Sequence, residues 1–137
     1  MTIKEQKYYF KCLQISAFFA SSLAMGYNYC DAWDLLLNSR QGQGILAEDW
    51  VYLTKHSGAY SAEEADSEIG YRYKKQSHIQ FVPREIKSFG KFIENMHKMY
   101  KIDYKDMFTK YSLDDFMSEN SFVLGNYDRK LYEKYFL

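Results

Sequence analysis

Apolar residues recur every three or four positions through most of this chain, and that spacing is typical of amphipathic helices. The longest such segment covers residues 4–25, and a second apolar row runs beside the first one. Its main face carries Tyr8, Cys12, Ile15, Phe19 and Leu23. We expect this helix to be buried over more than half its circumference, with Gly26 as a left-handed cap at its end.

Shorter helices follow in the first half. Asn28 can cap a second helix, and Gly42 and Gly44 are expected to break the chain after it. A third helix should then turn its apolar residues inward and stop at Gly58. Those apolar residues are Leu46, Trp50 and Leu53. The stretch from Ser61 to Glu64 has the form of a capping box, which predicts a short acidic helix running towards Ile69.

The second half continues the helical pattern after a short interruption. Residues 78–82 alternate apolar and polar side chains, which predicts an isolated strand near 79–82 or an extended linker. Pro83 suits the first turn of a clearly amphipathic helix reaching about residue 101. Further short helices are expected after Asp103, after Ser112 and over 127–137. The sequence therefore predicts an all-α fold: a compact bundle of about six to seven mostly short helices.

Length and charge suggest one domain with an internal boundary. The 137 residues match the usual size of a single domain, 1–137. Residues 61–69 carry four acidic side chains and no basic one, whereas residues 71–111 carry ten basic side chains against four acidic ones. A sub-boundary near Gly70 would divide a helical module, 1–69, from a basic helix with C-terminal helices, 70–137.

Composition removes several classes of protein. The 18 basic and 18 acidic side chains give a net charge of zero, which argues against a protein whose main function is to bind nucleic acid. The most apolar run, residues 15–25, is about half the ~20 residues that a membrane span needs. We read it as a buried helix and expect no membrane partner. Cys12 and Cys30 read as small buried residues in a reducing compartment, so we expect a cytoplasmic protein.

No motif in the chain carries recognisable chemistry. The three histidines stand about twenty residues apart, and neither a metal-ligand spacing, a phosphate loop nor a nucleophile elbow occurs. We therefore assign no catalytic residue, no metal ligand and no cofactor. An enzyme would instead need a pocket assembled by the fold, holding at least one of His56, His78 and His97 with a displaced pKa.

The charge boundary also carries aromatic residues, which make up 19% of the chain. Tyrosine covers contact area at low entropic cost and is enriched at protein interfaces. The candidate partner-binding residues are Tyr60, Glu63, Glu64, Tyr71, Arg72, Tyr73, Lys74 and Lys75. A bipolar surface of this kind suits a charged protein partner. The segment 71–75, with the basic helix 83–101, could alternatively stack on single-stranded nucleic acid, although the adjacent acids would repel phosphate.

Part of the chain resembles a known family. The features occur in order: Phe10-Lys-Cys12, three leucines over 35–37, Tyr52-Leu-Thr-Lys-His56 before Gly58, and an acidic stretch with Asp66 and Ile69. In this order residues 7–69 resemble a short all-helical bacterial family of unknown function, often encoded beside ADP-ribosyltransferase-like proteins. The resemblance implies a partner-binding role, as the companion of a toxin-like or effector enzyme. It has no catalytic residues to carry over.

These observations lead to one leading hypothesis and one alternative. The leading hypothesis is a non-catalytic, cytoplasmic protein-binding protein of bacterial or phage origin. It would act as an antitoxin, an immunity protein or a phage-encoded inhibitor, by covering a site on its partner. The alternative is a nucleic-acid-binding or transcription-regulatory helical protein. The wide apolar face of the first helix leaves a homodimer open as well.

Overall fold

The computed structural model describes residues 1–76, 84–120 and 128–137, and within them the fold is all-α, as the sequence predicts. The α-helices are α1 (Ile3–Ala24), α2 (Tyr29–Asn38), α3 (Arg40–Leu46), α4 (Gly58–Ile69), α5 (Phe89–Tyr100), α6 (Leu113–Glu119) and α7 (Asp128–Tyr135). A π-helical turn, Val51–Lys55, and 3-10 turns at Gly70–Arg72, Arg84–Ser88 and Tyr104–Asp106 complete the described elements. No described residue lies in a strand, and the predicted strand near 79–82 lies outside the described residues.

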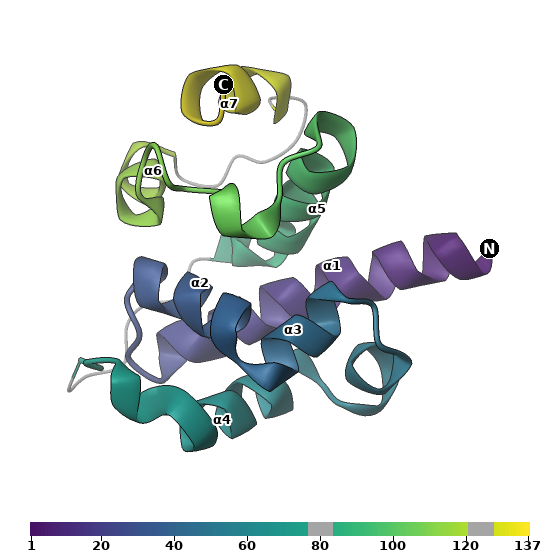
Figure 1. Ribbon diagram of the computed structural model, residues 1–137, viewed down its shortest axis with the longest axis vertical. Helices are drawn as coiled ribbons and strands as arrows, with labels where there is room; N and C mark the ends of the chain where they lie inside the picture. The colour runs from purple at the N-terminus through teal and green to yellow at the C-terminus, as the bar shows by residue number, and fades with distance from the viewer. Residues whose placement is uncertain (77–83, 121–127) are drawn as a thin grey trace.

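Helix α1 is the central element. Figure 1 shows α2, α3 and α4 packed along one side of it, and α5, α6 and α7 stacked on the other. Ile15, Phe19 and Leu23 of the predicted face are completely buried, whereas Tyr8 and Cys12 are half-buried. Tyr9 and Leu13 of the second apolar row are exposed, so the expected burial over more than half the circumference is wrong for the N-terminal part of α1. The helix ends where expected, because Gly26 adopts a φ of 104°. A side chain there would also meet the backbone of Gln76, so only glycine suits the position.

The predicted break at Gly42 and Gly44 is wrong, because both glycines lie inside α3. The chain breaks earlier, at Ser39, whose hydroxyl accepts a hydrogen bond from the backbone N–H of Gly42 at 2.9 Å. A Cβ at Gly42 would lie 1.8 Å from the carbonyl oxygen of Leu36. This glycine therefore lets two helices approach closely and does not end one.

The predicted third helix through Trp50 and Leu53 is also wrong. Helix α3 stops at Leu46, and Glu48 takes a left-handed φ of 61° that turns the chain. Residues 51–55 then form only the π-helical turn, in which Leu53 is buried as expected. Trp50 is 38% exposed instead of facing inward.

Helix α4 begins four residues before the predicted start. Ser57 is its N-cap, with a hydroxyl that accepts a hydrogen bond from the backbone N–H of Tyr60, while Ser61 is buried within the helix. Gly58 opens α4 and does not stop the preceding segment. A Cβ on Gly58 would lie 2.6 Å from the Cβ of Ala17, so this glycine lets α4 cross α1 closely.

The amphipathic pattern of α5 is confirmed, although its first turn is different. A 3-10 turn, Arg84–Ser88, precedes the helix, which starts at Phe89. Asp103 introduces only a 3-10 turn, whereas Ser112 caps α6 as predicted by accepting the backbone N–H of Asp115 at 3.1 Å.

Two different contacts fix α5 in the fold. On the side of α1, a Cβ on Gly90 would lie 1.9 Å from the carbonyl oxygen of Cys12. The Ser16 hydroxyl accepts the N–H of Gly90 and donates to the carbonyl of Lys87, at 2.8 and 2.9 Å. On the side of α6 and α7, aromatic rings make the contact, for example Phe92 on Phe116 with centroids 5.3 Å apart.

Candidate functional site

Helix α4 brings three of the predicted partner-binding residues together. Tyr60, Glu63 and Glu64 line a shallow depression of about 310 Å³ with Ser67 and Glu68. The Tyr60 hydroxyl donates a hydrogen bond of 2.7 Å to Glu64, and this bond raises the pKa of Tyr60. The ring itself stays 45% exposed. The solvent side of α4 is therefore acidic, with one aromatic ring at its start.

The other predicted residues follow α4 but do not share one surface. Tyr71 is the most exposed aromatic ring among the described residues, at 81%, and the Arg72 guanidinium lies 5.8 Å from its centroid. Lys74 is exposed as well. Tyr73, in contrast, packs its ring against buried Tyr27 and donates its hydroxyl to Asp34 at 2.7 Å. Burial and this bond raise the pKa of Tyr73, so it is a neutral structural donor.

Lys75 is bound to the body of the protein too. Its ammonium lies 2.9 Å from Asp66 of α4, and the Tyr27 hydroxyl donates to the same carboxylate. Burial alone would raise the pKa of Asp66, but the bonds from Tyr27 and Lys75 outweigh it and lower the pKa. We call Tyr27, Asp66, Tyr73 and Lys75 the Asp66 junction. It fixes the chain after α4 and holds Tyr71 at the surface.

The solvent-facing side of α4 forms one candidate surface. Glu68 is partly neutralised by Arg40, at 2.8 Å, whereas Glu63 has no ion pair in the described part of the chain. We give the name α4 face to this surface, Tyr60, Glu63, Glu64, Ser67 and Glu68, together with the exposed Tyr71 in the turn directly after the helix. It combines net negative charge with two exposed tyrosine rings.

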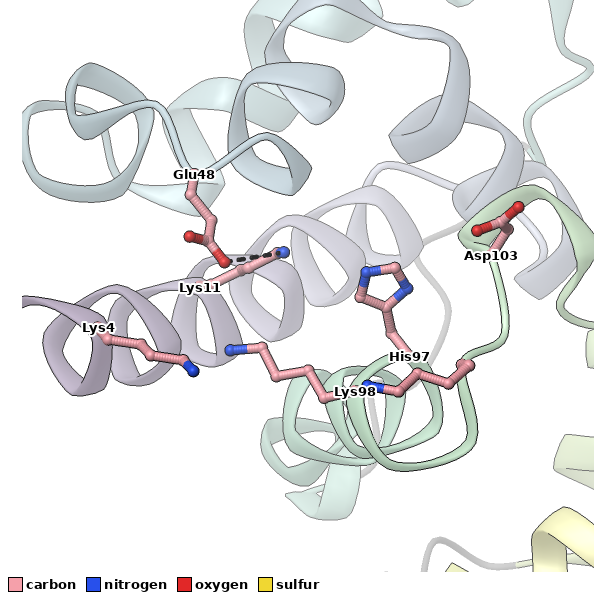
Figure 2. Close-up of a pocket in the computed structure, with 7 residues that line it drawn as sticks. Lys4, Lys11, Glu48, His97, Lys98 and Asp103 are labelled. Carbon is pink, nitrogen blue, oxygen red and sulfur yellow. Dashed lines mark hydrogen bonds and ion pairs between the residues drawn. The ribbon is translucent and has the colours of Figure 1, made fainter.

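A second candidate site lies between α1 and α5, and the sequence did not predict it. Figure 2 shows a hollow lined from both helices and from the turns after α3 and α5. Its volume is about 490 Å³. We call it the lysine pocket: Lys4, Lys11, Glu48, His97, Lys98, Lys101 and Asp103.

The floor of the lysine pocket is a buried ion pair. Lys11 is 2% exposed, and its ammonium lies 3.5 Å from Glu48 and 3.2 Å from Glu94, which has no exposed surface. The hydroxyl of Tyr104 donates a hydrogen bond to the other oxygen of Glu94. Burial and the neighbouring Glu94 carboxylate raise the pKa of Tyr104, so its proton stays on the phenol. Charges removed from water in this way must be paired, and the one ammonium of Lys11 serves both carboxylates.

His97 forms a side of the same pocket. Its Nδ1 lies 2.9 Å from the carbonyl oxygen of Ile102, and because a carbonyl only accepts, Nδ1 carries a proton. The imidazole stacks on Tyr104 at a centroid distance of 4.1 Å, which fixes its orientation. Nε2 is therefore the ring nitrogen that a ligand can meet.

Neither cysteine is an activated thiol. Burial, reinforced by the charge of Glu94, raises the pKa of Cys12 to about 11, so the thiol is protonated at neutral pH and is a weak nucleophile. Cys30 is also a free thiol, half-buried like Cys12. His56 lies between the rings of Tyr52 and Tyr60, and His78 lies outside the described residues.

Three further observations bear on classification. Comparisons with protein-family models, with curated proteins and with solved structures gave no match to this chain. The resemblance of residues 7–69 to a bacterial family therefore stays a prediction. Within the described residues, no three His, Cys, Asp or Glu side chains are placed to hold a metal ion. None of the described helices has both the length and the apolar character needed to cross a bilayer.

Proposed function

We propose that this chain is a non-catalytic protein-binding protein that covers a basic site on another protein with its α4 face. The observation that carries the proposal is the exposure of Tyr71. Its ring is 81% exposed although the chain directly after it is held by Tyr73 and Lys75 of the Asp66 junction. A large ring left in water on a held stretch of backbone is the type of residue that dominates binding energy in interfaces.

The charge of the α4 face supports a partner of stated chemistry. Glu63 and Glu64 lie beside Tyr60 in the shallow depression, and Glu63 has no cationic partner in the described residues. Acidic groups around exposed rings attract a surface rich in lysine and arginine, and they fix the orientation in which it docks. Because the Asp66 junction holds the chain beyond α4, docking would order few additional groups, which favours affinity.

The biological setting belongs to the same proposal. A small protein that covers a basic site on a partner would act as antitoxins, immunity proteins and phage-encoded inhibitors do. The two free thiols are of the kind that a reducing compartment maintains, so we place the protein in the cytoplasm. A homodimer through α1, where Tyr9 and Leu13 are exposed, stays a prediction.

Nucleic acid is the weaker candidate because the basic segment is divided. Of the five residues 71–75, Tyr73 is engaged with Asp34 and Lys75 with Asp66. Arg72 and Lys74 remain, next to a helix whose acids repel phosphate. A role in nucleic-acid binding predicts a steep loss of affinity as salt rises.

Affinity capture from the native host, with a matched pair of variants, tests the proposal. We expect the wild-type chain to retain a stoichiometric basic protein. Combining Tyr71→Ala with Glu63→Lys should weaken its binding about thirtyfold or more, the effect of losing one interface hot spot. The control is Tyr111→Ala, a similar ring exposed elsewhere at 39%. No stoichiometric partner, or a partner lost equally from the control, would contradict the proposal.

A further inference from the structure

We propose that the lysine pocket binds a small phosphate ester that carries free hydroxyl groups, such as a sugar phosphate. The pocket shares no residue with the α4 face, so this inference is independent of the function proposed above. It rests on the lysines around the hollow that form no ion pair within the described residues, on the carboxylates and the imidazole that line it with them, and on the contacts that hold its floor.

The pocket contains more positive charge than it neutralises. Lys11 is paired with Glu48 and Glu94, but among the described residues Lys4, Lys98 and Lys101 form no ion pair. In Figure 2 the side chains of Lys4 and Lys98 extend towards each other across the hollow. Ammonium groups gathered in one concave site repel each other and concentrate an anion there.

Ordinary helix electrostatics explain only part of this cluster. His97, Lys98 and Lys101 lie at the C-terminal end of α5, where cations interact favourably with the helix dipole. Lys4 lies in the first turn of α1, where the dipole disfavours a cation. The dipole therefore does not account for Lys4 beside the α5 lysines, and an anion in the pocket would stabilise it there.

One of these lysines is held in position. The ammonium of Lys98 lies 4.7 Å from the centroid of the Tyr8 ring, a cation–π distance. This contact restrains Lys98 without neutralising its charge. A restrained ammonium loses less freedom when it binds an anion, which improves affinity.

The pocket also has groups that suit hydroxyls. Glu48, Asp103 and the Nε2 of His97 lie around the same hollow, and carboxylates accept hydrogen bonds from hydroxyl groups. An inorganic phosphate would use only the ammonium groups. A volume of about 490 Å³ falls within the range of small-molecule sites and leaves room for a polyol or sugar beside the phosphate.

The floor can hold this arrangement steady. Lys11 and Glu94 form a buried pair that Tyr104 completes, and Tyr104 in turn stacks on His97. The Lys11–Glu94 pair is neutral, so Glu48 is the one carboxylate of the floor whose charge is left over beside the ammonium groups of Lys4, Lys98 and Lys101. The acidic side chains at the rim disfavour a long polyanion such as nucleic acid, so a small ligand is the better occupant.

The test is an NMR titration of the ¹⁵N-labelled protein with ribose 5-phosphate, glycerol 3-phosphate, inorganic phosphate and ribose. We expect saturable shifts of the amides around Lys98 and Asp103 with the two esters. Inorganic phosphate should bind at least tenfold more weakly than the better ester, and ribose should give no shift. No saturable shift with either ester would overturn the proposal, as would equal affinity for inorganic phosphate.

Variants connect the affinity to the pocket. Combining Lys98→Gln with Lys101→Gln should weaken the better ester at least tenfold. Lys91→Gln, a change of exposed charge on the same helix, should alter it less than twofold. Asp103→Asn should weaken the ester without weakening inorganic phosphate. If Lys91→Gln lowers the affinity for the ester as much per removed charge as the pocket variants do, binding depends only on the net charge of the protein and the proposal fails.

Discussion

Helix α5 packs against α1 on one side and against α6 and α7 on the other, and the two contacts differ in the kind of groups that make them. Towards α1, backbone meets backbone at Gly90, and the polar groups Ser16, Lys11 and Glu94 occupy defined positions. Towards α6 and α7 the contact is made by rings, with no buried ion pair in the described residues there.

The ring contact illustrates how the second type works. Phe92 stacks on Phe116, and Tyr100 stacks on Tyr132 with centroids 4.0 Å apart. Rings of this kind bury large areas and can shift slightly to accommodate a neighbour. A buried ion pair or a close contact at glycine does not adjust in this way. Removing one charge leaves the other unpaired, and adding a Cβ makes atoms overlap, and both changes cost stability. The comparison predicts that equal changes in the two contacts have unequal costs.

The largest effect should come from Lys11→Met. It leaves the fully buried carboxylate of Glu94 without its cation, and we expect the free energy of unfolding to fall by about 4 kcal/mol. Urea denaturation measures this change. Lys91→Met, on the exposed face of α5, should change it by less than about 0.5 kcal/mol. Adding Glu94→Leu to Lys11→Met should restore much of the lost free energy of unfolding. A double variant as unstable as Lys11→Met alone would show that the unpaired carboxylate is not the cause of the loss.

Gly90→Ala should follow, with a loss of about 3 kcal/mol. The new Cβ would lie 1.9 Å from the Cys12 carbonyl oxygen, so α5 must move away from α1 or tilt. Alanine is otherwise the better helix former, which makes a loss of stability diagnostic. Thermal unfolding measures it, and Lys91→Ala at the next position is the control. A Gly90→Ala protein as stable as the wild type would show that the two helices are not in close contact.

Phe116→Leu tests the ring contact and should cost only about 1 kcal/mol. Phe116 is completely buried among Phe92, Phe108 and Tyr135, but a leucine is apolar and nearly fills the space. Denaturation in urea again gives the value, with the exposed Tyr111→Leu as control. A cost equal to that of Gly90→Ala would remove the distinction between the two contacts.

The smallest effect concerns a charge at the surface, Asp66. Hydrogen bonds from Tyr27 and Lys75 lower its pKa in the folded protein, so the unfolded chain takes up the proton first as the pH falls. The stability that Asp66 supplies is therefore complete above pH ~4 and is lost as the pH falls through the lower folded value. We expect less than about 1 kcal/mol, because the site is partly solvated.

Asp66→Asn should remove this part of the acid dependence. The measurement compares unfolding free energies at pH 6 and pH 3 for the wild type and the variant. The exposed Asp106→Asn should leave the difference between the two pH values unchanged. An unaltered difference in Asp66→Asn would mean that the junction is not held by its carboxylate.

Local signals in the sequence predicted the fold better than they predicted the site. The caps Asn28 and Ser112 and the apolar face of α1 from Ile15 onward depend on neighbouring residues, and these predictions are confirmed. The prediction at Gly26 is confirmed, but those at Gly42 and Gly58 are wrong, because these two glycines serve close contacts with α2 and α1 that only the folded chain reveals.

The lysine pocket was missed for a related reason. Its groups come from both ends of the sequence, and no local spacing connects Lys11 with Glu94 or Lys4 with Lys98. One clue was available, since Lys11 interrupts the buried face of α1, and a charge in such a position needs a partner. That the partner of Lys11 is Glu94 could not be derived from the sequence, because it depends on how α1 and α5 cross.

The hydroxyl of Ser16 has a consequence for biosynthesis. It joins α1 to a backbone N–H 74 residues further along the chain. During translation the first helix would leave the ribosome long before α5 exists to cover it. The apolar side of α1 that α5 covers therefore stays exposed until then, because α4 packs on the other side of the helix. Contacts across such a separation also slow folding in general. A nascent chain arrested before residue 90 should therefore be the form most dependent on chaperones.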